Sequence, residues 1–220
     1  MEIKEIENKI INDDCMNILK QLPDKCVDLV LTDPPYGIDY CGQLVKGEDF
    51  KFVTNKNGWR NFGKKEWDNE RPSFEVFKEI LRVSKNQIIW GGNYFADFLP
   101  SSQGWLVWNK GQRNFSLADG ELAYTSFDKA LRIFDYARAN QQNEEKREHP
   151  TQKPVKLFEW CLTKYSKEND LVLDCFSGSG TTAIACSELN RRFICIEKDK
   201  EYWKKSVERL ENYNKQLKLF

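Results

Sequence analysis

Apolar residues in this chain come in short runs that alternate with segments of helical periodicity. The run 27–32, Val-Asp-Leu-Val-Leu-Thr, is almost continuously apolar, which is typical of a strand buried on both faces of a parallel sheet. It ends at two consecutive prolines, which cannot continue a central strand. Six further runs predict strands: 9–12, 87–90, 105–108, 121–127, 171–173 and 193–196.

Between these runs the apolar spacing changes to that of helices. Ser73 is placed to cap a helix whose apolar face would be Phe74, Phe77, Ile80 and Leu81. This alternation predicts an α/β protein with a mainly parallel sheet, in a single domain covering residues 1–220. Further helices are predicted at 15–22, 154–165, 182–189 and 202–219.

Two segments depart from the alternation. Residues 40–71 are rich in glycine, asparagine and lysine with scattered aromatic residues, which predicts a long loop, and such loops tend to be functional. Residues 128–148 are polar and charged. We therefore expect variable surface segments at about 40–71 and 113–148.

Charge and hydropathy narrow the class of protein. Lysine and arginine together number 34, and aspartate and glutamate together also number 34, so the net charge is zero. The chain therefore cannot coat nucleic acid by net charge alone, but this balance does not exclude a local basic groove. No apolar run approaches the roughly 18 residues that span a membrane, and residues 1–8 lack a signal core. We expect a cytoplasmic protein with no membrane partner.

The cysteines do not indicate a metal site. They are odd in number and none forms a C-x-x-C pair, so neither zinc ligands nor a disulfide framework is predicted. Buried reduced thiols are the expected state. The seven are Cys15, Cys26, Cys41, Cys161, Cys175, Cys186 and Cys195.

The clearest ligand-binding pattern is the stretch 173–182, where a buried strand runs into a glycine turn that opens a helix. Glycine lets the backbone approach a ligand, and the free N–H groups of a helix start attract anions. Gly178-x-Gly180-x-x-Ala183 fits the relaxed dinucleotide pattern, and Glu197 ends the next strand, where an acid binds ribose hydroxyls. Nucleoside binding is predicted; the alternative is a tight turn with Glu197 merely solvated.

The second candidate site is Asp33-Pro34-Pro35-Tyr36, directly after the strand 27–32. Ligands of open α/β sheets bind beyond the carboxyl ends of strands, so both motifs are expected at one edge. The prolines fix the backbone and leave carbonyls, a carboxylate and an aromatic ring exposed. This set suits a planar substrate that carries an amino group; the alternative is a rigid turn packed by the tyrosine.

Together these motifs resemble the S-adenosylmethionine-dependent DNA amino-methyltransferases. The tetrapeptide precedes the Phe176-x-Gly178-x-Gly180 turn, an order similar to the circularly permuted β group of that family. The segment His149-Pro-Thr-Gln-Lys-Pro and the pair Asp14-Cys15 also match that group. The resemblance covers about residues 9–210. It departs at Cys175, where the family commonly has proline, and at Gly37, where many members have asparagine.

The resemblance implies a Rossmann-like methyltransferase sheet, S-adenosylmethionine as cofactor, no metal, and double-stranded DNA as partner, recognised by 40–71 and 113–148. Two further partners are compatible with the resemblance: a second copy of the chain in a homodimer, and a cognate restriction enzyme. Catalysis is expected from Asp33, Pro34, Pro35 and Tyr36. The cofactor is expected at Asp14, Cys15, Asp33, His149, Thr151, Gln152, Lys153, Asp174, Phe176, Gly178, Gly180, Thr181, Thr182 and Glu197.

The reaction implied is methylation of the N6 amine of adenine. Asp33 and the Pro34 carbonyl would accept hydrogen bonds from the amine and Tyr36 would stack on the base, which must leave the duplex. The first residue is Asp33 rather than serine, which favours adenine over the N4 amine of cytosine. The alternatives from other classes are a dinucleotide-dependent oxidoreductase and a catalytically inactive DNA-binding protein.

Overall fold

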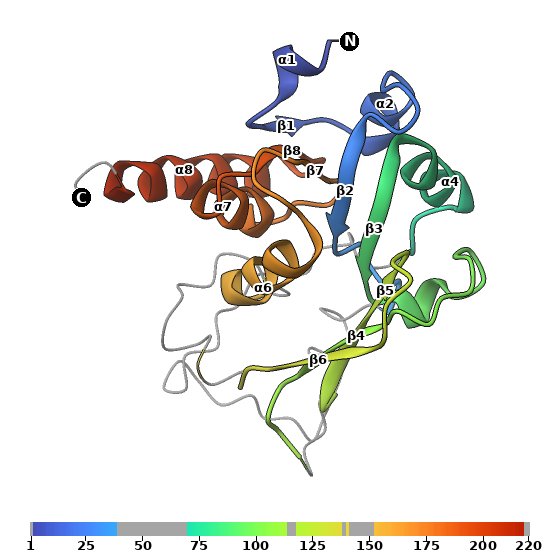
Figure 1. Ribbon diagram of the computed structural model, residues 1–220. Helices are drawn as coiled ribbons and strands as arrows, with labels where there is room; N and C mark the ends of the chain where they lie inside the picture. The colour runs from blue at the N-terminus through green and yellow to red at the C-terminus, as the bar shows by residue number, and fades with distance from the viewer. Residues whose placement is uncertain (1, 39–69, 114–117, 138–139, 141–151, 218–220) are drawn as a thin grey trace, which may run out of the picture.

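The computed structural model describes residues 2–38, 70–113, 118–137, 140 and 152–217 (Figure 1). Within these residues it contains one eight-stranded sheet with the order β1-β8-β7-β2-β3-β5-β4-β6. The prediction of an α/β fold with a mainly parallel sheet is confirmed. The strands are β1 (Lys9–Asn12), β2 (Val27–Thr32), β3 (Ser84–Trp90), β4 (Leu106–Asn109), β5 (Gly120–Thr125), β6 (Arg132–Asp135), β7 (Leu171–Asp174) and β8 (Arg192–Glu197).

Strand direction divides the sheet into two parts. From β1 through β8, β7 and β2 to β3, every neighbouring pair is parallel. Beyond β3 the sheet is mixed: β5 is antiparallel to both β3 and β4, and β6 is parallel to β4, so among the described strands only β5 runs in the opposite direction. The carboxyl ends of the five parallel strands therefore share an edge with the amino end of β5.

Helices cover both faces of the parallel part (Figure 1). The C-terminal helices α6, α7 and α8 lie on one face, and α2 and α4 lie on the other. Side chains of β2 alternate between the two cores: Leu29 and Leu31 pack with α6 and α7, and Val30 packs with α2 and α4. The helices are α1 (Ile3–Ile6), α2 (Cys15–Leu19), α4 (Phe74–Val83), the 3-10 turn η2 (Gly92–Phe95), α6 (Val155–Tyr165), α7 (Thr181–Glu188) and α8 (Lys200–Leu217).

Two local expectations were wrong. The buried face of α4 is Val76, Phe77, Ile80 and Val83, whereas Phe74 is 50% exposed and packs at the helix start against Phe98. The polar segment 128–148 contains β6, which the hydrophobic pattern does not predict. This strand lies at the edge of the sheet and is mostly exposed, so it has no apolar alternation to reveal it.

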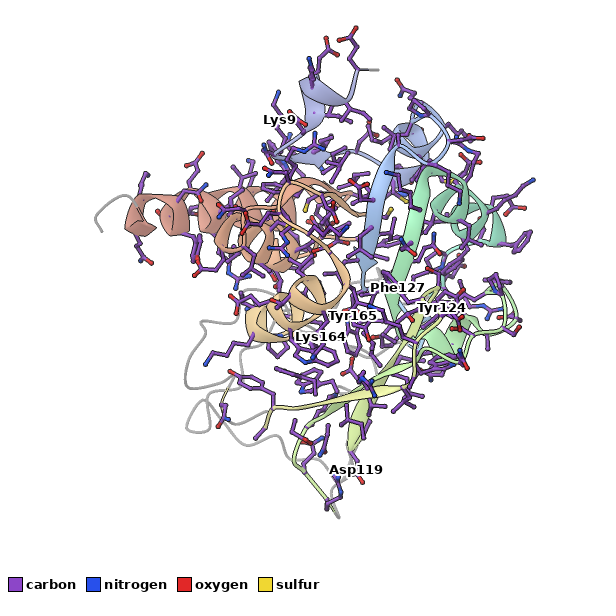
Figure 2. The ribbon with its side chains drawn as sticks, viewed as in Figure 1. Lys9, Asp119, Tyr124, Phe127, Lys164 and Tyr165 are labelled. Carbon is purple, nitrogen blue, oxygen red and sulfur yellow. The ribbon has the colours of Figure 1, made fainter. Side chains whose placement is uncertain are left out.

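An aromatic cluster joins the mixed part of the sheet to α6. Figure 2 labels Phe127 and Tyr165 side by side there, with ring centroids 4.9 Å apart. Phe134 of β6 lies 5.3 Å from Trp160 of α6. These contacts fix the mixed part of the sheet relative to the helical layer, and so position the residues at the ends of its strands.

Two further sequence expectations can be compared with the structure. Five cysteines are buried free thiols, Cys26 is partly exposed, and Cys41 lies outside the described residues. In the described part of the chain, no helix is both long and apolar enough to cross a membrane.

Candidate active site

The polar residues of both motifs meet at the carboxyl edge of the parallel strands. A cavity of about 900 Å³ opens there, between the ends of β2, β7 and β8. The two motifs therefore line one cavity, as the sequence analysis expects. His149 and Thr151 lie outside the described residues, and Gly180 is not among the lining residues. The lining includes Asp14, Cys15, Asp33, Pro34, Pro35, Tyr36, Gln152, Lys153, Asp174, Phe176, Gly178, Thr181, Thr182 and Glu197.

The glycine turn is shaped by left-handed backbone at two positions, with φ of 50° at Gly178 and 77° at Gly180. Gly180 is the N-cap of α7, and a side chain there would meet Ser206 of α8 at 3.0 Å. Only glycine adopts this conformation without strain while letting α8 pack so closely. The turn is therefore held rigidly between β7 and α7.

Glu197 supports the turn from the end of β8. Its Oε2 accepts a hydrogen bond from the Gly178 N–H at 2.8 Å, and its Oε1 accepts one from the Asp199 N–H at 2.7 Å. Burial raises the pKa of Glu197 to about 7, against the opposing effect of these two N–H groups. Each carboxylate oxygen retains a second lone pair with which to accept a ligand hydroxyl.

The turn also carries a polar group whose bonding capacity is unused. Ser177 lines the cavity, and its hydroxyl is buried and makes no hydrogen bond to any residue that the structure describes. Buried polar groups are normally paired, so this hydroxyl fits a site that receives a polar ligand. Together with Glu197 it makes the glycine turn suitable for a nucleoside with ribose hydroxyls.

Asp174 has a structural position at the end of β7. Its carboxylate accepts hydrogen bonds from Thr32 at 2.7 Å, from the Phe176 N–H at 3.1 Å and from Thr182. Burial raises its pKa to about 6 despite these donors. Since these three bonds tie β2 and α7 to β7, Asp174 shapes the cavity floor that both motifs share.

Asp14 and Cys15 begin α2, beside the end of β1. One Asp14 oxygen accepts a bond from the Met16 N–H, and the other pairs with Lys198 at 2.8 Å, which holds its pKa below the usual value. Burial raises the pKa of Cys15 to about 12, so its thiol stays protonated. The pair thus supplies a charged rim and an apolar wall to one end of the cavity.

Asp33 is the centre of a dense polar cluster. The Tyr36 hydroxyl donates a hydrogen bond to Asp33 Oδ1 at 2.7 Å, and the Lys153 ammonium lies 2.6 Å from Oδ2. Burial raises the pKa of Asp33, and the nearby ammonium opposes that shift. The resemblance places Lys153 among the cofactor residues, but the structure brings its side chain to the carboxylate of the tetrapeptide.

Glu121 and Lys110 complete this cluster, and the sequence analysis did not find them. The Lys153 ammonium lies 2.9 Å from Glu121 Oε2, and the Lys110 ammonium lies 2.5 Å from Oε1. Burial acts against ionisation, but the two lysines lower the pKa of Glu121 to about 2. Glu121 reaches this edge because β5 runs antiparallel to β3, a direction that no local pattern reveals.

The ring of Tyr36 is packed between neighbours from other parts of the chain. Tyr94 stacks on it with ring centroids 4.7 Å apart and planes 14° apart. Gly91, at φ 68°, is so close that a side chain there would lie 2.1 Å from the Tyr36 ring. Trp90-Gly91-Gly92-Asn93 is noticeable in the sequence, but its contact with Tyr36 depends on the pairing of β2 with β3.

A Rossmann-like sheet with a nucleoside-type turn and an acidic tetrapeptide at one edge defines the class of α/β methyltransferases. Comparison with known families narrows this class. The DNA methylase family model matches residues 46–208, most of the chain. The chain therefore belongs to the N6/N4 DNA methylase family.

Two curated relatives are similar over nearly the whole chain. The Type II methyltransferase M.HinfI of Haemophilus influenzae is 28% identical over 91% of this chain and 67% of its own length. The Type II methyltransferase M.HpaI of Haemophilus parainfluenzae is 28% identical over 94% of this chain and 75% of its own length.

Solved structures agree with this fold. The crystal structure of the M1.HpyAVI–SAM complex aligns with a TM-score of 0.59 and 27% identity, covering 92% of this chain and 99% of that one. The cytosine-N4-specific PvuII DNA methyltransferase aligns with a TM-score of 0.58 and 16% identity, over 94% and 91% of the two chains. A cytosine-N4 enzyme thus shares the fold, so the fold alone does not decide the target base.

Proposed function

We propose that this protein transfers a methyl group from S-adenosylmethionine to the N6 amine of adenine in a specific sequence of double-stranded DNA. One observation supports this most directly: the Asp33 carboxylate and the Glu197 carboxylate line the same cavity, from opposite motifs. A nucleoside cofactor held at Glu197 and an amine held at Asp33 would then meet within one enclosed space.

S-adenosylmethionine supplies a methyl group on a cationic sulfur. In this chain Glu197 would accept the ribose hydroxyls, Ser177 and the turn N–H groups would face the remaining polar groups, and Phe176 would pack against the adenine. Asp14 would contribute a charged side chain at the rim of the cofactor cavity. The unused Ser177 hydroxyl and the second lone pairs of Glu197 are the features of this structure that fit such a ligand.

The substrate amine is a weak nucleophile because its lone pair is delocalised into the ring. Asp33 and the Pro34 carbonyl would accept its two N–H bonds and so direct the lone pair at the methyl carbon. The amine nitrogen would bond to the methyl carbon as the carbon–sulfur bond breaks with its electron pair going to sulfur, and Asp33 would pass one amine proton to water. The chain contributes position and charge.

Adenine is proposed over cytosine because the tetrapeptide begins with Asp33 and not with serine. The relatives M.HinfI and M.HpaI are Type II methyltransferases, which supports a cognate restriction enzyme as a partner of this chain. Cytosine-N4 methylation is the competing outcome, since PvuII methyltransferase has the same fold.

Mass spectrometry of nucleosides tests this proposal. DNA from a methylation-free host is treated with the protein and labelled S-adenosylmethionine, and N6-methyladenine is the expected product. The matched variant is Asp33→Asn, which keeps the shape but loses the charge, and its rate should fall by about 100-fold or more. N4-methylcytosine as product would overturn the base assignment, and full activity of Asp33→Asn would overturn the mechanism.

DNA recognition is proposed for 40–71 and 113–148, most of which lie outside the described residues. Gly120 and Glu121, at the start of β5, line the cavity, and the segment 40–71 carries the adjacent lysines Lys64 and Lys65. Phosphate contacts weaken with salt, so the double change Lys64→Ala and Lys65→Ala should lower DNA affinity and flatten its salt dependence. Cofactor affinity, measured by calorimetry, should not change.

A further inference from the structure

The cluster around Asp33 contains Lys153, which has no role in the methyl transfer described above. The Lys153 ammonium has three acceptors: Asp33 Oδ2 at 2.6 Å, Glu121 Oε2 at 2.9 Å and the Tyr36 hydroxyl at 3.2 Å. An ammonium has three N–H donors, so these contacts use its full capacity. Its side chain is 5% exposed, which makes the arrangement a built feature of the cavity wall.

Lys153 and the two carboxylates that it contacts come from separate parts of the chain. Asp33 follows β2, Glu121 lies near the start of β5, and Lys153 precedes α6. Glu121 is in turn paired with Lys110, which follows β4. The four charged groups, Asp33, Glu121, Lys153 and Lys110, are called here the paired-charge cluster. They join the ends of three strands and the start of a helix around the Asp33 carboxylate.

We propose that Lys153 is a positioning residue that keeps Asp33 ionised and correctly oriented to accept the amine, with Glu121 holding Lys153 in place. An ionised carboxylate only accepts hydrogen bonds, whereas a protonated one presents a donor to the amine. With Tyr36 on Oδ1 and Lys153 on Oδ2, the rotation of the carboxylate is fixed and each oxygen retains a lone pair for the substrate. The inference rests on the proposed role of Asp33.

The charges that face Asp33 give the direction of each effect. Lys153 favours the ionised carboxylate, whereas Glu121 and Asp174 are like charges that disfavour it. The Tyr36 hydroxyl donates a bond to the ionised form. Removing Lys153 should therefore raise the pH at which Asp33 loses its proton, and then removing Glu121 should lower it again.

The experiment measures the single-turnover methylation rate against pH, with saturating labelled S-adenosylmethionine and DNA from a methylation-free host. In Lys153→Met the acid limb of the profile should move up by about 1–3 pH units. Adding Glu121→Gln to that variant should move the limb part of the way back. Lys153→Arg keeps the charge, and its limb should stay close to that of the parent.

The matched control is Lys85→Met. Lys85 is paired with Asp28 at 2.7 Å, but at the opposite end of the strands and with 56% of its side chain exposed. Its pH profile should equal that of the parent. A merely structural role for Lys153 would lower the rate without moving the limb, and that result would overturn the inference.

The outcomes separate this inference from the proposed function. If Asp33→Asn is fully active, the proposed role of Asp33 fails. If Asp33→Asn is inactive but Lys153→Met has the parent profile, only the role of Lys153 fails. If Lys153→Met does not fold, the double variant with Glu121→Gln decides: a limb above that of the parent supports the inference, and an unmoved limb overturns it.

Discussion

The Thr32 hydroxyl donates a hydrogen bond to Asp174 Oδ1 at 2.7 Å, joining residues that are 142 positions apart in the sequence. Thr32 precedes the acidic tetrapeptide and Asp174 precedes the glycine turn. The two motifs are thus held in register by a buried bond between the ends of β2 and β7, beneath the cavity that both line.

Thr32→Val removes this bond while keeping the side-chain shape. A hydrogen bond to a charged group contributes roughly 1.5–3 kcal/mol, so we expect the free energy of unfolding to fall by about that amount. Urea denaturation measures it. Thr163→Val, at an exposed position on α6, is the control and should change stability by no more than about 0.5 kcal/mol. Equal stability of both variants would show that the Thr32 bond contributes nothing.

Cofactor-site affinity should rise with pH through the titration of Glu197. Burial gives this carboxyl a pKa of about 7, and ribose hydroxyls donate to its ionised form. Binding therefore favours the deprotonated state, and affinity should increase from pH 6 to pH 8. Calorimetry with 5′-methylthioadenosine measures this cleanly, because that nucleoside has no amine or carboxyl of the amino-acid type.

The variant for this test is Glu197→Gln, which cannot ionise. Its affinity for the nucleoside should be lower at pH 8 and should no longer change between pH 6 and pH 8. The same raised pKa also affects folding: because the folded state holds this proton more tightly, stability from this group falls as pH rises from about 4.5 to 7. A pH-dependent affinity that persists in Glu197→Gln would assign the titration to another group.

Gly91→Ala should displace the Tyr36 ring. The new side chain would lie 2.1 Å from the ring, in addition to the strain of φ 68°. We expect a loss of methylation of about 10-fold or more, since small misplacements at the reacting groups are costly. Gly111→Ala is the matched control: it has φ 64°, but its nearest contact is Ala137 at 3.3 Å.

Both variants should lose stability of roughly 1 kcal/mol from the left-handed backbone, as measured by thermal unfolding. Only Gly91→Ala should lose methylation beyond that shared effect. If the two variants keep equal activity, the packing of Gly91 against the tyrosine ring has no role in positioning the ring.

Tyr36→Phe keeps the ring and removes the hydroxyl that donates to Asp33. A bond to a charged group contributes about 1.5–3 kcal/mol, so the methylation rate should fall by roughly 10- to 100-fold. The sequence analysis gave Tyr36 a role in stacking only, and the hydrogen bond to Asp33 adds a role for its hydroxyl. Rates at saturating substrate test this. Tyr124→Phe is the control and should keep the parent rate, because the Tyr124 hydroxyl makes no hydrogen bond to Asp33 in the structure.

The sequence determined the parallel part of the sheet and the two motifs at its edge. Continuous apolar runs such as 27–32 encode strands buried on both faces, and Gly178 and Gly180 encode a turn that few other residues could form. Because parallel strands must end at a common edge, the meeting of Asp33 and Glu197 followed from local pattern and topology.

Only the tertiary structure decided what surrounds Asp33. Lys153 stands in a motif that the resemblance places on the cofactor side. Glu121 lies in β5 and Lys110 follows β4, two strands whose direction cannot be predicted from their local sequence. Charge pairs between residues that are distant in the chain depend on strand order and direction, not on local pattern. The reversal of β5 after β3 thus brought a glutamate to the edge where the parallel strands end.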